Sequence, residues 1–213
     1  MTMDIKICGL STKETISAVA ENGGTHAGFI FFEKSPRNVS VALAADLMAH
    51  AESLGLKTVA VTVDADSAFL DEIVSVAKPQ ILQLHGKETP ERVNEVKARH
   101  SRETWKAFSV SHLDDLAKLD AYRGITDRFL LDAKPPKGSD LPGGNAVSFD
   151  WSILTKMPTG MDYLLSGGVD ADNVTQAIAA GAPALDLSSG VESGPGVKDI
   201  GKIKAFFKAV AAA

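Results

Sequence analysis

Short apolar runs alternate with amphipathic segments along the whole chain. Brief runs rich in branched and aromatic side chains are typical of buried strands. We expect strands at 4–8, 26–31, 58–63, 80–84, 104–108, 128–132, 162–166 and 184–187. Between them, apolar residues recur at helical spacing and predict helices near 12–22, 40–54, 67–77, 89–99, 112–119, 171–180 and 199–212.

Several of the predicted helices end in residues that helix ends prefer. Thr89 followed by Pro90 is typical of an N-cap and a first turn, and Gly181 is typical of a C-cap. The sixth strand is the exception, because no clear helical pattern follows it. A loop rich in Gly and Pro at 134–147 takes that place and leads to a short segment at 149–154.

Eight strands that alternate with helices over about 200 residues predict a parallel sheet, and eight such units close into a (β/α)8 barrel. The alternative is an open doubly wound sheet, which usually has fewer strands and a glycine-rich fingerprint after the first one. Only Gly9 follows the first strand here. The pattern therefore favours an α/β barrel of the TIM type, and the lack of a long linker predicts one domain over residues 1–213.

Composition narrows the class of protein. Hydrophobic residues make up 45% of the chain and charged residues 23%, as in ordinary globular domains. The net charge of −5 offers no basic field for nucleic acid or a membrane surface. No apolar run reaches the length of a transmembrane helix, and Asp4 and Lys6 interrupt the first hydrophobic stretch, which is unlike a signal peptide. With a single cysteine, we expect a cytoplasmic protein. Charged helices without an apolar outer stripe predict a monomer.

Chemically active side chains stand at the ends of four predicted strands. Cys8 ends the first strand, His85 follows the fourth, Asp132 ends the sixth and Asp186 lies in the eighth. Active sites of these barrels are built at the carboxyl ends of the strands. The four side chains are therefore expected to meet at one rim. No group of His, Cys, Asp and Glu has the spacing of metal ligands, so we expect no metal.

Alternation along the strands predicts which side chains face inward, because successive residues point to opposite faces. Lys6 and Cys8 share one face, and their neighbours Ile5 and Ile7 share the other, which suits the helices. Gln83 and His85 likewise point together. We expect Lys6, Cys8 and His85 to face the barrel interior.

Two glycine-containing loops predict a phosphate site. Ser166-Gly167-Gly168 follows the seventh strand, and Ser188-Ser189-Gly190 follows the eighth and is expected to open a short extra helix. Barrels often bind phosphate between these loops, since glycine lets backbone N–H groups approach and a helix N-terminus favours an anion. The same glycines could simply make tight turns. Two such loops in these positions favour phosphate binding.

The rim residues each allow two interpretations. Asp132 could cap a helix or pair with Lys134, or hold a raised pKa and act as a general acid. His85 could be a satisfied structural histidine or a substrate contact. Asp186 could orient a ribose hydroxyl or pair with Lys6.

Cys8 also has two interpretations. It could be a small buried hydrophobe, or a thiolate that acts as a base. The second role needs its usual pKa of about 8.5 to be lowered, at about 1.4 kcal/mol per unit. Lys6, on the same face of the strand, is a possible source of that stabilisation.

The motifs along the chain resemble those of the phosphoribosylanthranilate isomerase family, barrel enzymes of tryptophan biosynthesis. The resemblance covers essentially the whole chain, in order, and its most specific parts are the cysteine, Ser-Pro-Arg and Ser-Ser-Gly-Val-Glu motifs. The matching segments are Lys6-Ile-Cys-Gly-Leu, Gly28-Phe-Ile-Phe-Phe, Ser35-Pro-Arg, Leu82-Gln-Leu-His-Gly, Leu131-Asp132, Phe149-Asp-Trp, Ser166-Gly-Gly, Asn173-Val174 and Asp186-Leu-Ser-Ser-Gly-Val-Glu.

The resemblance implies an Amadori rearrangement of N-(5′-phosphoribosyl)anthranilate, a phosphosugar, without a cofactor. By analogy Asp132 is the general acid that opens the furanose ring, and Cys8 is the general base that removes the C2′ proton. Arg37 would hold the anthranilate carboxylate, for which a planar fork is suited. Asp186 and His85 would face the sugar or the aromatic ring. The phosphate would be surrounded by Gly167, Gly168, Ser188, Ser189 and Gly190.

One loop departs from the family pattern, and two other functions remain as alternatives. The family usually shows Gly-Gly-Thr-Gly before Phe-Asp-Trp, whereas this chain has Gly143-Gly144-Asn145-Ala146, which we expect to affect loop closure. A related aldose–ketose isomerase of histidine biosynthesis would carry two phosphate sites and a carboxylate in place of Cys8. A phosphosugar-binding protein without activity would need no pair of acid and base.

Overall fold

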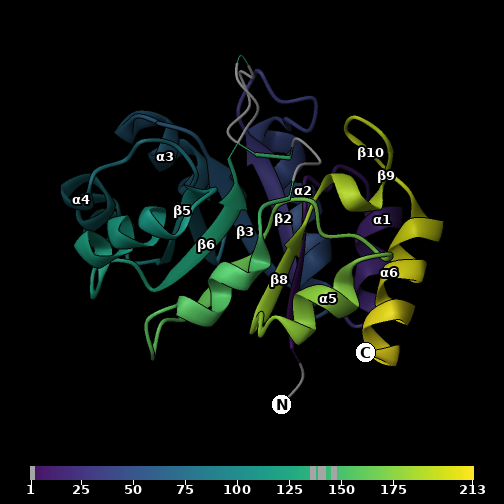
Figure 1. Cartoon of the computed structure of the whole chain (residues 1–213). Helices are drawn as coiled ribbons and strands as arrows, with labels where there is room; N and C mark the ends of the chain where they lie inside the picture. Colours follow the sequence, from purple (N-terminus) through teal and green to yellow (C-terminus); the bar gives the residue numbers. More distant parts are fainter. Residues whose placement is uncertain (1–2, 135–137, 139–142, 145–147) are drawn as a thin grey trace.

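Eight parallel strands close into a barrel, as predicted. The computed structural model describes residues 3–134, 138, 143–144 and 148–213, and shows the strands in the centre with helices on both sides (Figure 1). The barrel closes where the first strand pairs with the last, with Lys6 opposite Asp186. The strands are β1 (Asp4–Cys8), β2 (His26–Phe31), β3 (Lys57–Thr62), β4 (Ile81–Leu84), β5 (Glu103–Val110), β6 (Arg128–Ala133), β7 (Tyr163–Leu165) and β8 (Ala184–Leu187).

The helices follow the predicted ranges, with local differences in their type. Thr89 caps its helix by accepting a hydrogen bond from the Arg92 backbone N–H, and Gly181 has a positive φ of 90°, so both predicted caps are confirmed. The α-helices are α1 (Lys13–Glu21), α2 (Val41–Ser53), α3 (Ser67–Glu72), α4 (Pro90–His100), α5 (Val174–Ala179) and α6 (Ile200–Ala212). A π-helical turn, η1 (Ile73–Ala77), continues α3, and 3-10 helices form η2 (Leu113–Tyr122) and η3 (Trp151–Lys156).

The segment after β8 differs from the prediction of a short extra helix. It forms a single 3-10 turn, η4 (Ser189–Val191), followed by an antiparallel hairpin of β9 (Glu192–Gly194) and β10 (Val197–Lys198). Gly196 turns the hairpin with a φ of 80°, a backbone region that favours glycine. Most of the predicted loop at 134–147, including Asn145 and Ala146, lies outside the described residues.

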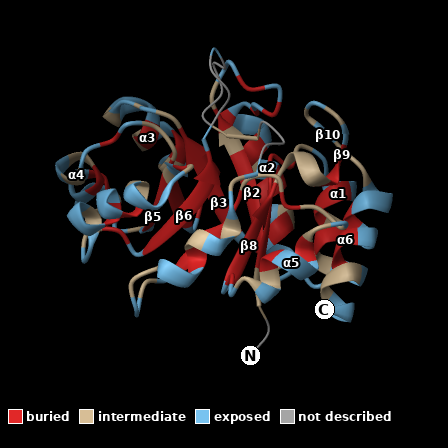
Figure 2. Cartoon of the chain, in the orientation of Figure 1, coloured by how far each residue is buried: buried red, intermediate tan, exposed pale blue. Residues whose placement is uncertain are grey.

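Two apolar layers hold the barrel together and confirm the predicted alternation. Ile5 and Ile7 pack in the layer between the sheet and the helices, whereas Cys8 belongs to the smaller cluster inside the barrel. Trp105 is fully buried in that inner cluster. Figure 2 shows the strands buried at the centre and the exposed positions gathered on the helices and loops.

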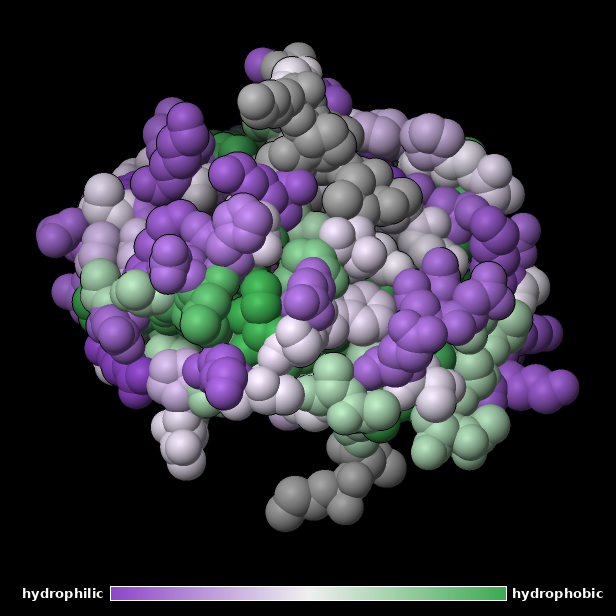
Figure 3. Space-filling model, in the orientation of Figure 1, coloured by the Kyte–Doolittle hydropathy of each residue, from purple (hydrophilic) through white to green (hydrophobic). Residues whose placement is uncertain are grey.

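The outer surface carries both hydrophilic and apolar side chains (Figure 3). Figure 3 shows hydrophilic side chains over both flanks of the visible face, with apolar side chains in a strip between them. Among the described residues, no helix is long and apolar enough to cross a membrane.

Candidate active site

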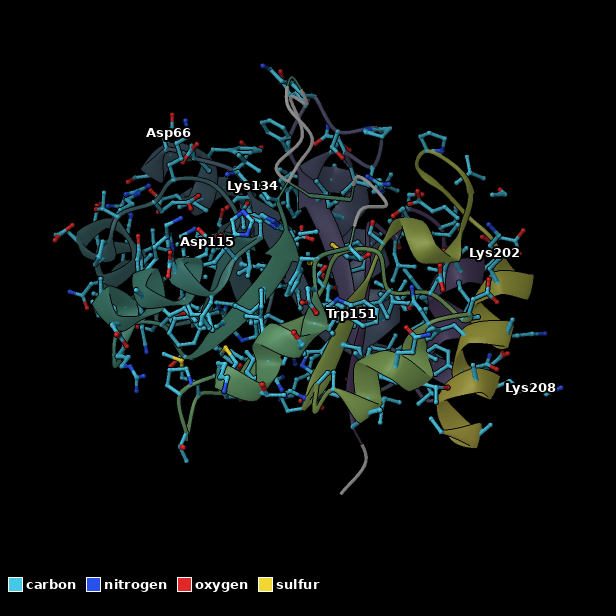
Figure 4. The ribbon with its side chains drawn as sticks, viewed as in Figure 1. Asp66, Asp115, Lys134, Trp151, Lys202 and Lys208 are labelled. Carbon is cyan, nitrogen blue, oxygen red and sulfur yellow. The ribbon has the colours of Figure 1, made fainter. Side chains whose placement is uncertain are left out.

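The predicted rim residues converge on one pocket at the carboxyl ends of the strands. This pocket is lined by Cys8, Arg37, His85, Asp132 and Asp186, together with apolar residues of β2 and β3. A second cavity shares Asp132 and Asp186 with it and extends over the glycine loops. Lys134, which directly follows β6 and is labelled in Figure 4, belongs to neither lining.

Lys6 and Asp186 form an ion pair inside the barrel. The Lys6 Nζ donates to Asp186 Oδ1 at 2.7 Å, and the Ser166 hydroxyl donates to the other carboxylate oxygen at 3.2 Å. Lys6 is fully buried, which by itself would lower its pKa, but the Asp186 carboxylate outweighs burial and raises it. Of the two interpretations of Asp186, pairing with Lys6 is therefore the one observed.

Room for this ion pair comes from Gly28 on the neighbouring strand. A Cβ at Gly28 would lie 3.0 Å from the Cys8 Cα and 3.1 Å from the Lys6 Nζ. Both distances are shorter than most contacts that Cβ atoms make in proteins. The lack of a side chain at this position thus allows the Lys6 ammonium to lie against β2, next to Cys8.

Cys8 lies at the end of β1, buried and unpaired. Burial raises the pKa of its thiol, while the Lys6 and Lys198 ammonium groups oppose that shift without cancelling it. The sequence offered Lys6 as a source of a lowered pKa; in the structure Lys6 is already neutralised by Asp186. Burial therefore favours the protonated form of the thiol over the thiolate.

Asp132 faces His85 across the top of the barrel. Its Oδ2 lies 3.4 Å from His85 Nε2, and its Oδ1 accepts the Ala133 backbone N–H at 2.9 Å. The Gln83 amide lies 3.2 Å from the other ring nitrogen of His85. Among the described residues, Asp132 caps no helix and forms no ion pair with Lys134, and its carboxylate lies beside His85 at the pocket wall.

Gly143 covers this pair of side chains from above. A Cβ at Gly143 would lie 2.2 Å from Asp132 Oδ2 and 3.1 Å from His85 Nε2. Gly143 therefore lies directly over the two titratable groups. This close approach helps to exclude water from Asp132.

Arg37 reaches the pocket from the loop after β2. Its Nε and Nη2 each donate to the Glu192 carboxylate at 2.8 Å, and Nη2 also lies 3.3 Å from the Gly144 carbonyl. Gly9, with a φ of 79°, leaves space for it, since a Cβ there would lie 2.6 Å from the Arg37 Cδ. Glu192 belongs to the Ser-Ser-Gly-Val-Glu motif, but sequence reasoning gave it no role.

The two glycine loops form the far end of the pocket. Gly167, Gly168, Ser188 and Ser189 line the second cavity, whereas Gly190 does not. Gly190 instead packs against the preceding loop, where a Cβ would lie 2.1 Å from the Val169 carbonyl oxygen. Its contribution to the cavity is therefore to let the two loops approach each other.

Within the glycine loop after β7, backbone and side-chain bonds fix the turn. Gly167 and Gly168 have positive φ values of 84° and 69°, and the Asn173 amide donates to the Gly168 carbonyl at 2.7 Å. Asn173 also accepts the Asp170 backbone N–H at 2.9 Å. The turn is thus held in place before any anion binds.

Among the described residues, no group of three or more His, Cys, Asp or Glu side chains is arranged to hold a metal ion. The available chemistry is that of one thiol, one carboxylate and the imidazole beside that carboxylate, all lining one pocket. Such a set is suited to moving protons on a bound small molecule. The arginine at one end and the glycine loops at the other offer sites for two anionic groups.

Comparison with known proteins points to one family over nearly the whole chain. Residues 5–209 match the family model described as N-(5'phosphoribosyl)anthranilate (PRA) isomerase. The N-(5'-phosphoribosyl)anthranilate isomerase of Agrobacterium fabrum is 58% identical over 211 residues, which cover 99% of this chain and 96% of that protein.

Solved structures agree over the full length. Phosphoribosyl anthranilate isomerase from Thermus thermophilus is 30% identical with a TM-score of 0.85, covering 99% of both chains. A phosphoribosyl anthranilate isomerase in complex with reduced 1-(o-carboxyphenylamino)-1-deoxyribulose 5-phosphate is 29% identical with a TM-score of 0.82, covering 100% of both.

Proposed function

Since the chain belongs to the N-(5′-phosphoribosyl)anthranilate isomerase family, we propose which of its residues carry out the reaction of that family. The protein is an isomerase of tryptophan biosynthesis that converts N-(5′-phosphoribosyl)anthranilate to the corresponding 1-deoxyribulose 5-phosphate. This is an aldose-to-ketose Amadori rearrangement. The relatedness also disfavours the isomerase of histidine biosynthesis and the inactive binding protein as alternatives.

The observation that supports our assignment is that Cys8, at the end of β1, and Asp132, in β6, line the same pocket. Asp132 donates a proton to the furanose ring oxygen, the bond from C1′ to that oxygen breaks, and an iminium ion forms between C1′ and the anthranilate nitrogen. The Cys8 thiolate then removes the proton from C2′ and gives an enolamine. In the last step C1′ gains a proton and the 2′ hydroxyl loses one, which yields the ketone.

The remaining predicted residues bind the two ends of the substrate. Arg37 holds the anthranilate carboxylate, and the backbone of Gly167 and Gly168 with Ser188 and Ser189 holds the phosphate. With both anionic ends fixed, the sugar carbons are brought within reach of the acid and the base, which lowers the entropic part of the barrier. His85 orients Asp132 from the side.

Asp186 has two roles in the proposed reaction: it pairs with Lys6, and it binds the sugar of the substrate. Its Oδ1 is bound by the Lys6 ammonium, while Oδ2 carries only the Ser166 hydroxyl at 3.2 Å. Asp186 and Ser166 both line the pocket. Among the described residues Oδ2 has no other side-chain partner, so it is the acceptor for a sugar hydroxyl.

The experiment compares Cys8→Ser and Asp132→Asn with the parent protein. Substrate is generated from anthranilate and phosphoribosyl pyrophosphate with the preceding enzyme, and loss of its fluorescence is followed. Each variant is expected to lose about 100-fold or more of its turnover, because each lacks one proton-transferring group. Asp46→Asn, which changes an exposed carboxylate on α2, is the matched control and should react like the parent. Turnover near the parental rate in Cys8→Ser or Asp132→Asn would remove that residue from the mechanism.

We also propose that the protein acts as a monomer in the cytoplasm. Charged helices without an apolar outer stripe in the sequence support a monomer. The role of Cys8 requires a reduced thiol, which a reducing compartment maintains. Light scattering at micromolar concentration tests the first point, and a stable dimer would contradict it.

A further inference from the structure

Glu192 joins two cations that come from different loops. Its carboxylate accepts two hydrogen bonds from Arg37 at 2.8 Å each, one from the Lys198 ammonium and one from the Gly196 backbone N–H at 3.2 Å. The side chains of all three charged residues are at most 5% exposed. Arg37 and Lys198 outweigh the effect of burial and lower the pKa of Glu192, which stays ionised. This buried cluster, Arg37–Glu192–Lys198, is formed by the β9–β10 hairpin and the loop after β2.

The cluster decides which edge of Arg37 is open. A guanidinium can bind a carboxylate through its Nε/Nη2 side or through its Nη1/Nη2 end. Glu192 occupies the first of these. Nη1 has no hydrogen-bond partner among the described residues, and Arg37 lines the pocket beside Cys8. Nη2 also donates to the Gly144 carbonyl at 3.3 Å, so a substrate carboxylate would meet the Nη1/Nη2 end through Nη1.

Lys198 determines the net charge of the Arg37–Glu192–Lys198 cluster. Arg37 and Glu192 alone would be neutral together and would attract an anion weakly. Lys198 adds a second positive charge, so the cluster as a whole carries +1. Its ammonium is fixed by the Ser188 carbonyl at 3.1 Å as well as by Glu192. The hairpin thus supplies both the carboxylate that orients Arg37 and the cation that restores its attraction for an anion.

We propose that Glu192 is a positioning residue that turns the Nη1/Nη2 end of Arg37 toward the pocket and thereby selects substrates with a carboxylate on the aromatic ring. This inference rests on the proposed role of Arg37. The effect of Glu192 on the orientation of Arg37 can be distinguished from its effect on charge, because removing the Glu192 charge makes the cluster more positive. Charge alone would then strengthen carboxylate binding, whereas loss of orientation weakens it.

The test measures the Kd of two unreactive ligands by calorimetry. One is the reduced product, which carries the ring carboxylate, and the other is the same compound made from aniline, which lacks it. The parent protein should prefer the carboxylated ligand by about 10- to 100-fold, the range for a charge-assisted hydrogen-bonded pair. Glu192→Gln should reduce that preference by about tenfold, with the aniline ligand bound within about twofold of the parent. Glu95→Gln, at an exposed position on α4, is the matched control.

Glu192→Asp provides a second variant, which keeps the charge and shortens the side chain. It should also lower the preference, because the two 2.8 Å contacts cannot both be kept. A preference that is unchanged or increased in Glu192→Gln and unchanged in Glu192→Asp would overturn the inference. Arg37→Met separates this failure from that of the proposed function: if Arg37→Met keeps the preference for the carboxylate, the role of Arg37 itself is wrong.

Discussion

Replacing Lys6 with Met is expected to destabilise the barrel through the charge that it leaves behind. Lys6 is fully buried, and the side chain of its partner Asp186 is 5% exposed. In the Lys6→Met variant, the Asp186 carboxylate would keep only the 3.2 Å hydrogen bond from Ser166 among its described side-chain contacts. The variant thus isolates the cost of an unpaired carboxylate inside the barrel.

The magnitude follows from this burial. Breaking a buried ion pair by removing one partner costs about 3–5 kcal/mol, because the other charge stays desolvated. Folded domains are stable by only about 5–15 kcal/mol, so this is a large part of the total. Removing both charges in Lys6→Met/Asp186→Asn should restore at least about half of the loss, since replacing a whole buried pair is often close to neutral.

Equilibrium unfolding in urea, followed by tryptophan fluorescence, measures these differences. The midpoint of Lys6→Met should fall with little change in the slope, which reports the surface exposed on unfolding. Lys13→Met, which breaks an exposed pair with Asp46, is the matched control and should cost less than about 1 kcal/mol. If Lys6→Met costs as little as Lys13→Met, or if the double variant is less stable than the single one, the reasoning about the buried pair is refuted.

Three further predictions concern pH and packing. Because burial raises the pKa of the Cys8 thiol, kcat/KM should keep rising with pH beyond about 8.5; a plateau below pH 7 would contradict this. Burial lowers the pKa of His26 to about 4, so the unfolded chain takes up a proton near pH 6.5 and the folded one does not. Unfolding free energy should therefore fall by about 2 kcal/mol between pH 7 and pH 4.5, and His26→Gln should lose most of that pH dependence. Gly28→Ala should cost about 1–3 kcal/mol and reduce kcat, since the new methyl group lies against Lys6; parental stability and rate would show that the site has room for it.

Much of the fold follows from local patterns that the sequence displays directly. The strand ranges and the inward direction of Lys6 and Cys8 depend on alternation, a property of one strand at a time. The caps at Thr89 and Gly181 are equally local. These features could be predicted because no distant residue is needed to specify them.

The ion pairs of the site could not be predicted in this way. Arg37 and Glu192 are 155 positions apart, and nothing near Lys198 in the sequence marks it as a partner of Glu192. The pairing of Lys6 with Asp186 was one of two open interpretations, and the register between β1 and β8 decides it. The direction of the Cys8 pKa shift likewise depends on the depth of burial, which only the closed barrel sets.

The ion pair at the junction of β1 and β8 has a consequence for how the enzyme is made. Lys6 leaves the ribosome before Asp186, which follows 180 positions later. Until then the growing chain holds an ammonium group without its carboxylate, on a strand that has only one of its two neighbours. A chain that stops before β8 consequently has neither a closed barrel nor a reaction centre, so the first appearance of activity during synthesis or refolding marks the moment at which the ring of strands is completed.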